Sequence, residues 1–234
     1  MNTANALMNA LMVTGTDTGV GKTVLTSALA AYWQAFQPQR SLGLLKPVQS
    51  GVGDRELYQR LFLPNESLEA ITPQYFEAPL APPLAAALEG RSLDLAAAWR
   101  ALERLCRERH WVLVEALGGL GSPVTMELTV ADVAAAWRLP VVLVVSVKLG
   151  AIAQAVANVA LARQCQLVLR GIVLNCPEPR TEDEIDRWAP ASLITGLTQV
   201  PVLGTLPYLE NPEDLEKLAT VAASLDLEGL GLFA

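Results

Sequence analysis

The residues with the clearest chemical potential lie near the N-terminus, in the run VTGTDTGVGKT at residues 13–23. Its glycines, followed by Lys22 and Thr23, separate an apolar stretch from an alanine-rich one, which is the strand–turn–helix context of a phosphate-binding loop. In such a loop, backbone N–H groups surround a phosphate, the lysine neutralises the outer phosphates and the threonine hydroxyl reaches Mg²⁺. The strict pattern has glycine at position 16, where this chain has Thr16, so a plain glycine-rich turn is the alternative. We predict an ATP site formed by Thr16, Asp17, Thr18, Gly19, Val20, Gly21, Lys22 and Thr23.

Three further polar residues follow apolar runs or a glycine-rich turn. Glu115 ends the run WVLVE, where a P-loop protein typically carries the acid that completes the Mg²⁺ shell, and two glycines near it would let a ligand approach closely. Lys46 ends LGLLK before a proline, and a second lysine near a triphosphate could stabilise charge on a transferred phosphoryl group. An ordinary strand-end carboxylate and a lysine reaching to solvent are the alternatives. Two roles are open for Asp54, which could be an oxygen ligand of the metal or a helix N-cap.

The hydrophobic pattern predicts the elements that position these residues. Continuously apolar runs indicate strands buried on both faces, and their alternation with longer helical patterns indicates parallel pairing. The strands are expected at residues 11–14, 42–45, 111–114, 141–147, 171–174 and 202–206, and the helices at residues 24–34, 93–108, 129–137, 151–163, 182–188 and 213–225. We predict one P-loop NTPase domain of the α/β class over residues 1–234, with an open, mainly parallel sheet and helices on both faces. The proline-rich residues 64–83 lack periodicity and are expected to wrap the surface or form a lid.

Composition limits the kinds of partner, metal and catalytic chemistry that this chain could use. The 234 residues carry a net charge of −7, so no basic field gathers nucleic acid or an anionic membrane surface. Three cysteines without a C-x-x-C pair argue against zinc and indicate a reducing compartment, and no apolar run has the length of a membrane span, so a cytoplasmic location is expected. His110, the single histidine, begins a strand at the edge opposite the predicted site, which disfavours histidine-based acid–base catalysis.

Six segments, in this order and spacing, resemble the dethiobiotin synthetase family: VTGTDTGVGKT, LLKPVQSG, WVLVEALGG, VVLVVSVKLG, GIVLN and LGTLPYLENPE. The resemblance implies a homodimeric, Mg-ATP-dependent enzyme that converts 7,8-diaminopelargonic acid and CO₂ to dethiobiotin, ADP and phosphate. One substrate amine captures CO₂ as a carbamate, a carbamate oxygen attacks the γ-phosphate, and the second amine closes the ring on the mixed anhydride.

The same resemblance implies a role for individual positions. Lys22 would contact phosphates, Lys46 and Ser50 would hold the carbamate, and Thr18 would line the substrate pocket. Thr23, Asp54 and Glu115 would hold Mg²⁺, and the nucleotide base would be recognised by Asn175 with Pro207, Tyr208, Leu209 and Glu210. The chain departs from the family pattern at Gly19, Ala116, Leu117, Ala153 and residues 80–83, and most of these positions bear on binding of the diamine.

Two other classes share parts of this pattern. A partition or positioning ATPase carries a signature lysine in its P-loop where this chain has Asp17, and the acidic balance argues against binding to DNA or membrane. An amidotransferring synthetase usually adds a glutaminase domain with a nucleophilic cysteine, for which His110 is poorly placed.

Overall fold

A computed structural model describes residues 9–232 of the chain. The predicted single domain over residues 1–234 includes residues 1–8 and 233–234, which lie outside the described residues. Within residues 9–232, no helix combines the length and apolar character needed to cross a membrane.

The described residues build a six-stranded sheet in which every pair of neighbours is parallel. Its strands, in spatial order, are β2 (Leu42–Leu45), β5 (Trp111–Glu115), β1 (Ala10–Gly15), β6 (Val141–Ser146), β7 (Leu169–Asn175) and β8 (Val202–Leu206). Leu113 stands between Leu11 and Leu44 in register, so these buried leucines form one row across the sheet. The predicted α/β class and parallel sheet are confirmed.

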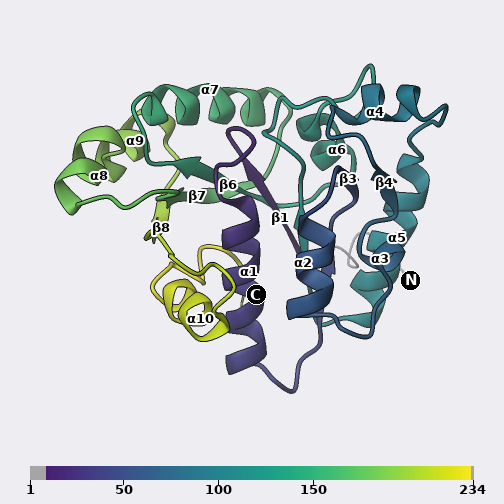
Figure 1. Ribbon diagram of the computed structural model, residues 1–234. Coiled ribbons are helices and arrows are strands. Elements are labelled where there is room, and N and C mark those ends of the chain that lie inside the picture. The colour runs from purple at the N-terminus through teal and green to yellow at the C-terminus, as the bar shows by residue number, and fades with distance from the viewer. Residues whose placement is uncertain (1–8, 233–234) are drawn as a thin grey trace.

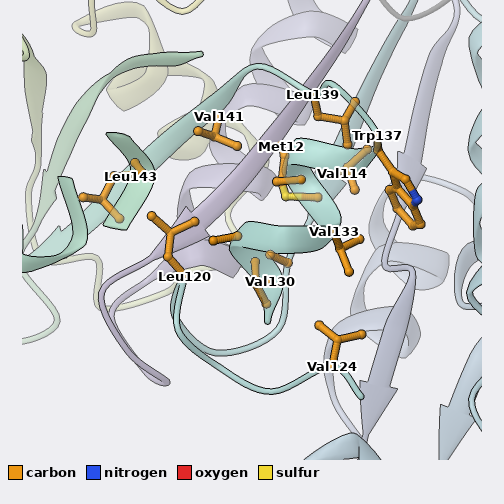
Figure 2. Packing of buried hydrophobic residues seen from close by; sticks show 14 of the residues in the cluster. Met12, Val114, Leu120, Val124, Val130, Val133, Trp137, Leu139, Val141 and Leu143 are labelled. Carbon is orange, nitrogen blue, oxygen red and sulfur yellow. The ribbon is translucent and has the colours of Figure 1, made fainter. Parts of the chain in front are cut away.

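Helices cover both faces of this sheet (Figure 1). On one face α1 (Lys22–Phe36) and α10 (Leu215–Ala223) pack over Leu113 and its row. On the other face α5 (Leu95–Glu108), α6 (Val130–Ala136) and α7 (Ala151–Gln164) pack over the alternate strand residues such as Met12 and Val114. Figure 2 shows part of this second core, where Val130, Val133 and Trp137 meet the strands. Because strand side chains alternate between faces, each strand contributes to two separate apolar layers.

The region between β2 and α5 contains more regular structure than the sequence predicts. It holds β3 (Val48–Ser50), α2 (Asp54–Leu61), α3 (Leu68–Ile71), β4 (Gln74–Phe76) and α4 (Pro82–Leu88), and β3 pairs with β4 in a second, two-stranded parallel sheet. The prediction of an irregular segment over residues 64–83 is therefore wrong for α3 and β4, although residues 79–81 form a connecting loop. Later in the chain, α8 (Glu182–Trp188) is as predicted and α9 (Ala191–Thr198) is additional.

The parallel arrangement brings the carboxyl ends of the strands to one edge of the sheet. The residues after β1, β2 and β5, which are neighbours in space, are the glycine-rich loop, Lys46 and the segment after Glu115. Ligands of open α/β folds bind at this edge. His110 precedes β5 at the opposite edge, where its Nδ1 lies 3.0 Å from the backbone nitrogen of Ser41, as the predicted structural role requires.

Candidate active site

The glycine-rich loop leads directly into α1. Gly21 is the N-cap of this helix with φ 103°, a left-handed conformation that favours glycine. A Cβ atom at Gly21 would also clash with the side-chain amide of Asn175. The Asn175 Nδ2 atom donates a hydrogen bond to the Val20 carbonyl at 3.0 Å, so this buried amide at the end of β7 supports the loop from below. Gly21, Lys22 and Thr23 line the cleft beside this loop, so the free N–H groups at the start of a long helix are available there for a phosphate.

Four side chains from four different segments meet beside this loop. The Lys46 Nζ atom lies 2.5 Å from Asp54 Oδ2 and 2.6 Å from Glu115 Oε1. The Thr23 hydroxyl lies 3.2 Å from Asp54 Oδ1 and 3.2 Å from Glu115 Oε1. The cluster therefore combines one cation, two carboxylates and a hydroxyl within hydrogen-bond reach of one another.

Burial excludes the alternative in which the Lys46 side chain reaches into solvent. Lys46 and Glu115 are 3% and 1% exposed, so both side chains lie inside the protein. Burial by itself lowers the pKa of Lys46, but the carboxylates of Glu115 and Asp54 outweigh it and raise that pKa above its ordinary value. Burial likewise favours neutral Asp54, yet Lys46 keeps the pKa of this carboxyl below its usual range. At neutral pH, Lys46 therefore carries a positive charge and Asp54 a negative one.

Asp54 does not act as the helix N-cap, because Gly53 occupies that position and Asp54 is the first residue of α2. Its carboxylate points instead to Lys46 and Thr23. Of the two roles that the sequence left open, the helix N-cap is therefore excluded.

Lys22 lies under the loop, where its Nζ atom donates to the Asp17 carbonyl at 2.9 Å. Burial lowers the pKa of Lys22 to about 8, while Glu115 opposes this shift. A lysine whose charge is disfavoured in this way gains from a nearby anion, and the phosphates of a nucleotide would supply one.

The cluster forms the floor of a cleft of about 670 Å³. Thr18, Gly19 and Gly118 line it on the loop side, and the turn before α4 lines it on the other. The Ser50 hydroxyl also lines this cleft and has no hydrogen-bond partner although its oxygen is buried. A buried hydroxyl without a partner is costly, so Ser50 is placed to bind a polar ligand.

The donor set of the cluster suits a hard divalent cation. Within residues 9–232, no metal site is formed by three or more His, Cys, Asp or Glu side chains, and this cluster contains two such side chains and a hydroxyl. Asp54, Glu115 and Thr23 offer only oxygen atoms, which Mg²⁺ prefers, and this ion usually takes its remaining ligands from water and substrate phosphates. Two carboxylates and a hydroxyl beside a phosphate-binding loop therefore fit Mg²⁺.

The other predicted residues fall into three places. Thr16 and Asp17 belong to the loop: the Thr16 hydroxyl lies 3.4 Å from Gln154 Oε1, and Asp17 Oδ1 accepts from the Thr18 backbone at 2.7 Å. Val20 is buried in the core beneath α1 and contributes its carbonyl. The segment after β8 lies at the same sheet edge but does not line the cleft; it comprises Pro207, Tyr208, Leu209 and Glu210.

Sequence reasoning missed two buried residues next to the cluster. The Tyr58 hydroxyl donates to Glu115 Oε2, and the Gln49 amide holds the loop that connects Ser50 to Asp54. Tyr58 lies four residues after Asp54, and this helical spacing is a signal that could have found it once α2 was recognised.

The glycines near Glu115 also have a more specific role than predicted. A Cβ atom at Gly119 would stand 2.8 Å from the Thr16 carbonyl group, and the Leu120 backbone nitrogen donates to the Gly15 carbonyl at 3.1 Å. Gly119 thus allows the segment after β5 to approach the phosphate-binding loop, whereas Gly118 lines the cleft itself.

Some known proteins resemble this chain in sequence, and others resemble it in fold. A family model described as an AAA domain matches residues 9–214. The chain is 57% identical over 223 residues to the ATP-dependent dethiobiotin synthetase of Gloeothece citriformis, covering 95% of this chain and 99% of that protein. It is 52% identical over 225 residues to the ATP-dependent dethiobiotin synthetase of Synechocystis, covering 95% of each.

Solved structures show the same architecture at much lower sequence identity. The MinD protein in the Aquifex aeolicus MinC:MinD complex has a TM-score of 0.58 at 15% identity, covering 95% of this chain and 94% of that one. A ParA family ATPase from Chlorobium tepidum has a TM-score of 0.55 at 12% identity, covering 97% and 99%. These two likenesses establish the P-loop NTPase fold alone. The sequence relatives are more specific, and the chain belongs to the dethiobiotin synthetase family.

Proposed function

We propose that this chain is an ATP-dependent dethiobiotin synthetase, which forms a cyclic urea from 7,8-diaminopelargonic acid and CO₂ with release of ADP and phosphate. The observation that carries the proposal is the meeting of Lys22, Lys46 and Glu115 at one cleft, although they are far apart in the sequence. Family membership supports the same activity.

The reaction consists of three bond changes on the substrates. One amine of the diamine adds to CO₂ and gives a carbamate, and a carbamate oxygen then attacks the γ-phosphorus of ATP as the bond to ADP breaks. The second amine attacks the carbonyl carbon of this mixed anhydride, the ring closes and phosphate leaves. Each step places or moves negative charge, so the residues that matter most are the cations and hydrogen-bond donors of the cleft.

Lys46 and Ser50 are assigned to the carbamate. The Lys46 ammonium is fixed between two carboxylates at the floor of the cleft, and the unpartnered Ser50 hydroxyl lies near it along the chain. A fixed cation and donor stabilise the carbamate and the charge that develops on the transferred phosphoryl group. Thr18, which also lines the cleft, is assigned to the diamine.

Lys22 and the loop N–H groups are assigned to the phosphates, and Thr23, Asp54 and Glu115 to Mg²⁺. When bound, Mg²⁺ would neutralise phosphate charge and polarise the γ-phosphoryl group. Asn175 and the segment after β8 are assigned to the nucleotide base, because Asn175 ends β7 and the segment follows β8 at the edge where the loop lies.

A homodimer in the cytoplasm is part of the proposal. Met126, which is 82% exposed, lines a groove together with residues of α4, and Leu84 and Leu88 of the same helix are 55% and 72% exposed. Exposed apolar side chains of this kind support association between copies of the chain. Sedimentation equilibrium tests the mass, and a monomer at micromolar concentration would contradict this part of the proposal.

The experiment that tests the activity follows radiolabelled bicarbonate into the cyclic urea while phosphate release is measured with Mg-ATP. Phosphate release is expected to require the diamine and to match incorporated label one to one. Omission of the diamine is the control. ATP turnover that is indifferent to the diamine, or that transfers ammonia from glutamine, would overturn the proposed function.

A further inference from the structure

We propose that Tyr58 is a positioning residue for Glu115 and so sets the affinity of the site for its divalent cation. The inference rests on the proposed function, which assigns Glu115 to that cation. Tyr58 is fully buried at 0% exposure on α2, and its hydroxyl donates a hydrogen bond to Glu115 Oε2. The family resemblance does not point to this residue.

The two oxygens of Glu115 have different partners. Oε1 lies 2.6 Å from Lys46 Nζ and 3.2 Å from the Thr23 hydroxyl, on the side of the cluster. Oε2 accepts the hydrogen bond from the Tyr58 hydroxyl, on the side of α2. Rotation of the carboxylate would break both sets of bonds, so Tyr58 determines which oxygen is offered to a cation beside Thr23.

Tyr58 also links the two carboxylates of the site through one helix. Asp54 and Tyr58 are four residues apart on α2 and therefore lie on the same face of it. Asp54 contacts Thr23 and Lys46 directly, while Tyr58 contacts Glu115, so the position of α2 sets both carboxylates together. Without the hydroxyl, Glu115 would have a buried oxygen without a partner.

Packing alone is the competing explanation for a buried tyrosine. The Tyr58 ring lies 6.5 Å from the Phe62 ring, centroid to centroid, at the end of the same helix. A role limited to packing would make α2 less stable when Tyr58 is changed but would leave the intrinsic affinity for the cation unchanged. The test must therefore measure cation binding directly and compare variants with similar losses of stability.

The experiment measures Mn²⁺ binding by electron paramagnetic resonance in the full-length protein with saturating ADP. Tyr58→Phe is expected to weaken Mn²⁺ binding about tenfold, the loss typical when an outer partner of a metal ligand is removed. ADP binding in EDTA should be unchanged. If Tyr58→Phe gives no folded protein, Tyr58→Met, which also lacks the hydroxyl, is measured in its place with the same expectation.

Two control variants separate the hydroxyl from packing. Tyr32→Phe removes the same group from α1, where the ring packs on Phe36 at 4.7 Å between centroids, and should bind Mn²⁺ like the wild type. Phe62→Leu should lower stability through α2 and leave Mn²⁺ affinity unchanged. In turnover assays, excess Mg²⁺ should restore the kcat of Tyr58→Phe, because only cation affinity is reduced.

The outcomes distinguish this inference from the function on which it rests. Wild-type protein that binds Mn²⁺, together with a Tyr58→Phe variant that binds it equally well, would overturn the role of Tyr58 alone. A Phe62→Leu variant that loses as much affinity as Tyr58→Phe would also overturn it, because packing would then explain the loss. Wild-type protein that binds no Mn²⁺ with ADP would overturn the metal site of the proposed function and the role of Tyr58 with it.

Discussion

Lys46 is held by Asp54 and Glu115 at 2.5 and 2.6 Å inside the protein. A buried ion pair of this kind is weak evidence for a purely stabilising role, since apolar residues of similar size often stabilise a core as well. The position of this lysine at the floor of a polar cleft is better explained by chemistry on an anionic substrate.

Replacement of Lys46 by alanine is expected to reduce kcat by about 10²- to 10³-fold, in the range found when one donor to a developing negative charge is removed. Nucleotide affinity should change much less, because Lys22 and the loop bind the phosphates. Single-turnover phosphate release and ADP titration measure the two effects. Lys22→Ala is the matched control and should mainly weaken nucleotide binding. An unchanged kcat in Lys46→Ala would remove this residue from the mechanism.

Replacement of Thr23 by valine keeps the shape of the side chain and removes its hydroxyl. The variant is expected to need about tenfold more Mg²⁺ for half-maximal turnover, because one oxygen ligand is lost. The melting temperature should change little, since Thr23 lies at the start of α1 at the edge of the cleft. Mg²⁺ titrations of wild type and variant test this, and equal dependence on the metal would contradict the assignment of Thr23.

Lys22 gives a prediction about pH. Its folded-state pKa of about 8 lies below the ordinary 10.5, mainly because of burial. The unfolded chain therefore holds this proton more tightly, and the ligand-free protein gains stability from this group as pH rises from about 8 to about 10.5.

Phosphates raise the pKa of Lys22 again, so nucleotide binding takes up a proton above pH 8. ADP affinity is expected to fall by up to about tenfold per pH unit in that range. Calorimetry in buffers of different ionisation enthalpy measures the proton. Lys22→Arg, which stays charged, is the control and should lose the pH dependence. Identical pH profiles in the two proteins would assign the dependence to another group.

At the scale of elements, α2 and the loop before it are the parts on which the site depends most. The Gln49 side chain is 4% exposed and makes two backbone contacts: Oε1 accepts from the Arg55 nitrogen at 3.0 Å and Nε2 donates to the Gly51 carbonyl at 2.9 Å. One buried amide thus caps α2 and fixes the loop that carries Ser50.

Gln49→Met, of similar size, is expected to lower the free energy of unfolding by about 1–3 kcal/mol, since backbone groups lose their partner. It should also lower kcat/KM for the diamine, because Ser50 and Asp54 are no longer held in place. Gln74→Met is the control: Gln74 is also buried and bonds the backbone of Pro73 and Asp94 away from the cleft. A similar loss of activity in both variants would show that stability alone accounts for the effect.

The elements that the sequence predicts correctly are those with a strong local pattern. Continuous apolar runs identify all six strands of the main sheet within a few residues, and α1, α5 and α7 follow from their long periodic segments. The elements that were missed are short: β3 and β4 have three residues each, α3 has four, α4 has seven, and α2 and α9 have eight each. Such elements form because they pair with each other and with the core, and this information is not local.

The residues of the candidate site also divide into those that the sequence predicts and those that it does not. Lys22, Thr23, Lys46 and Glu115 follow strand ends or the loop, so the rule for parallel sheets places them at one edge without coordinates. The spacing from Asp54 could place Tyr58 on the same face of a helix, but its contact with Glu115 could not be predicted, because that contact depends on the orientation of α2 relative to β5. The closeness of Gly119 to Thr16 depends likewise on how two loops pack, which glycine spacing alone does not indicate.

At the scale of the whole molecule, the cleft joins segments that belong to different apolar layers. α1 packs in the core on one face of the sheet, while the turn at Pro79 and α4 adjoin the core on the other. Glu115 ends the strand β5, which contributes to both layers. A ligand in this cleft therefore contacts both halves of the structure, and its binding energy adds to the stability of the entire fold.

This coupling predicts a rise in melting temperature. At about 100 times its dissociation constant, a ligand that binds only the folded state adds about 2.7 kcal/mol, which corresponds to about 5–10 °C for a chain of this size. The full rise in melting temperature is expected with Mg-ADP. With ADP in EDTA the rise should be smaller, because the carboxylates lack their cation. Differential scanning calorimetry measures both, with Thr23→Val as the control in which added Mg²⁺ contributes less. A single cooperative transition that shifts as a whole is expected, since the layers share the sheet; a shift confined to one of two transitions would show that the ligand contacts only one half of the molecule.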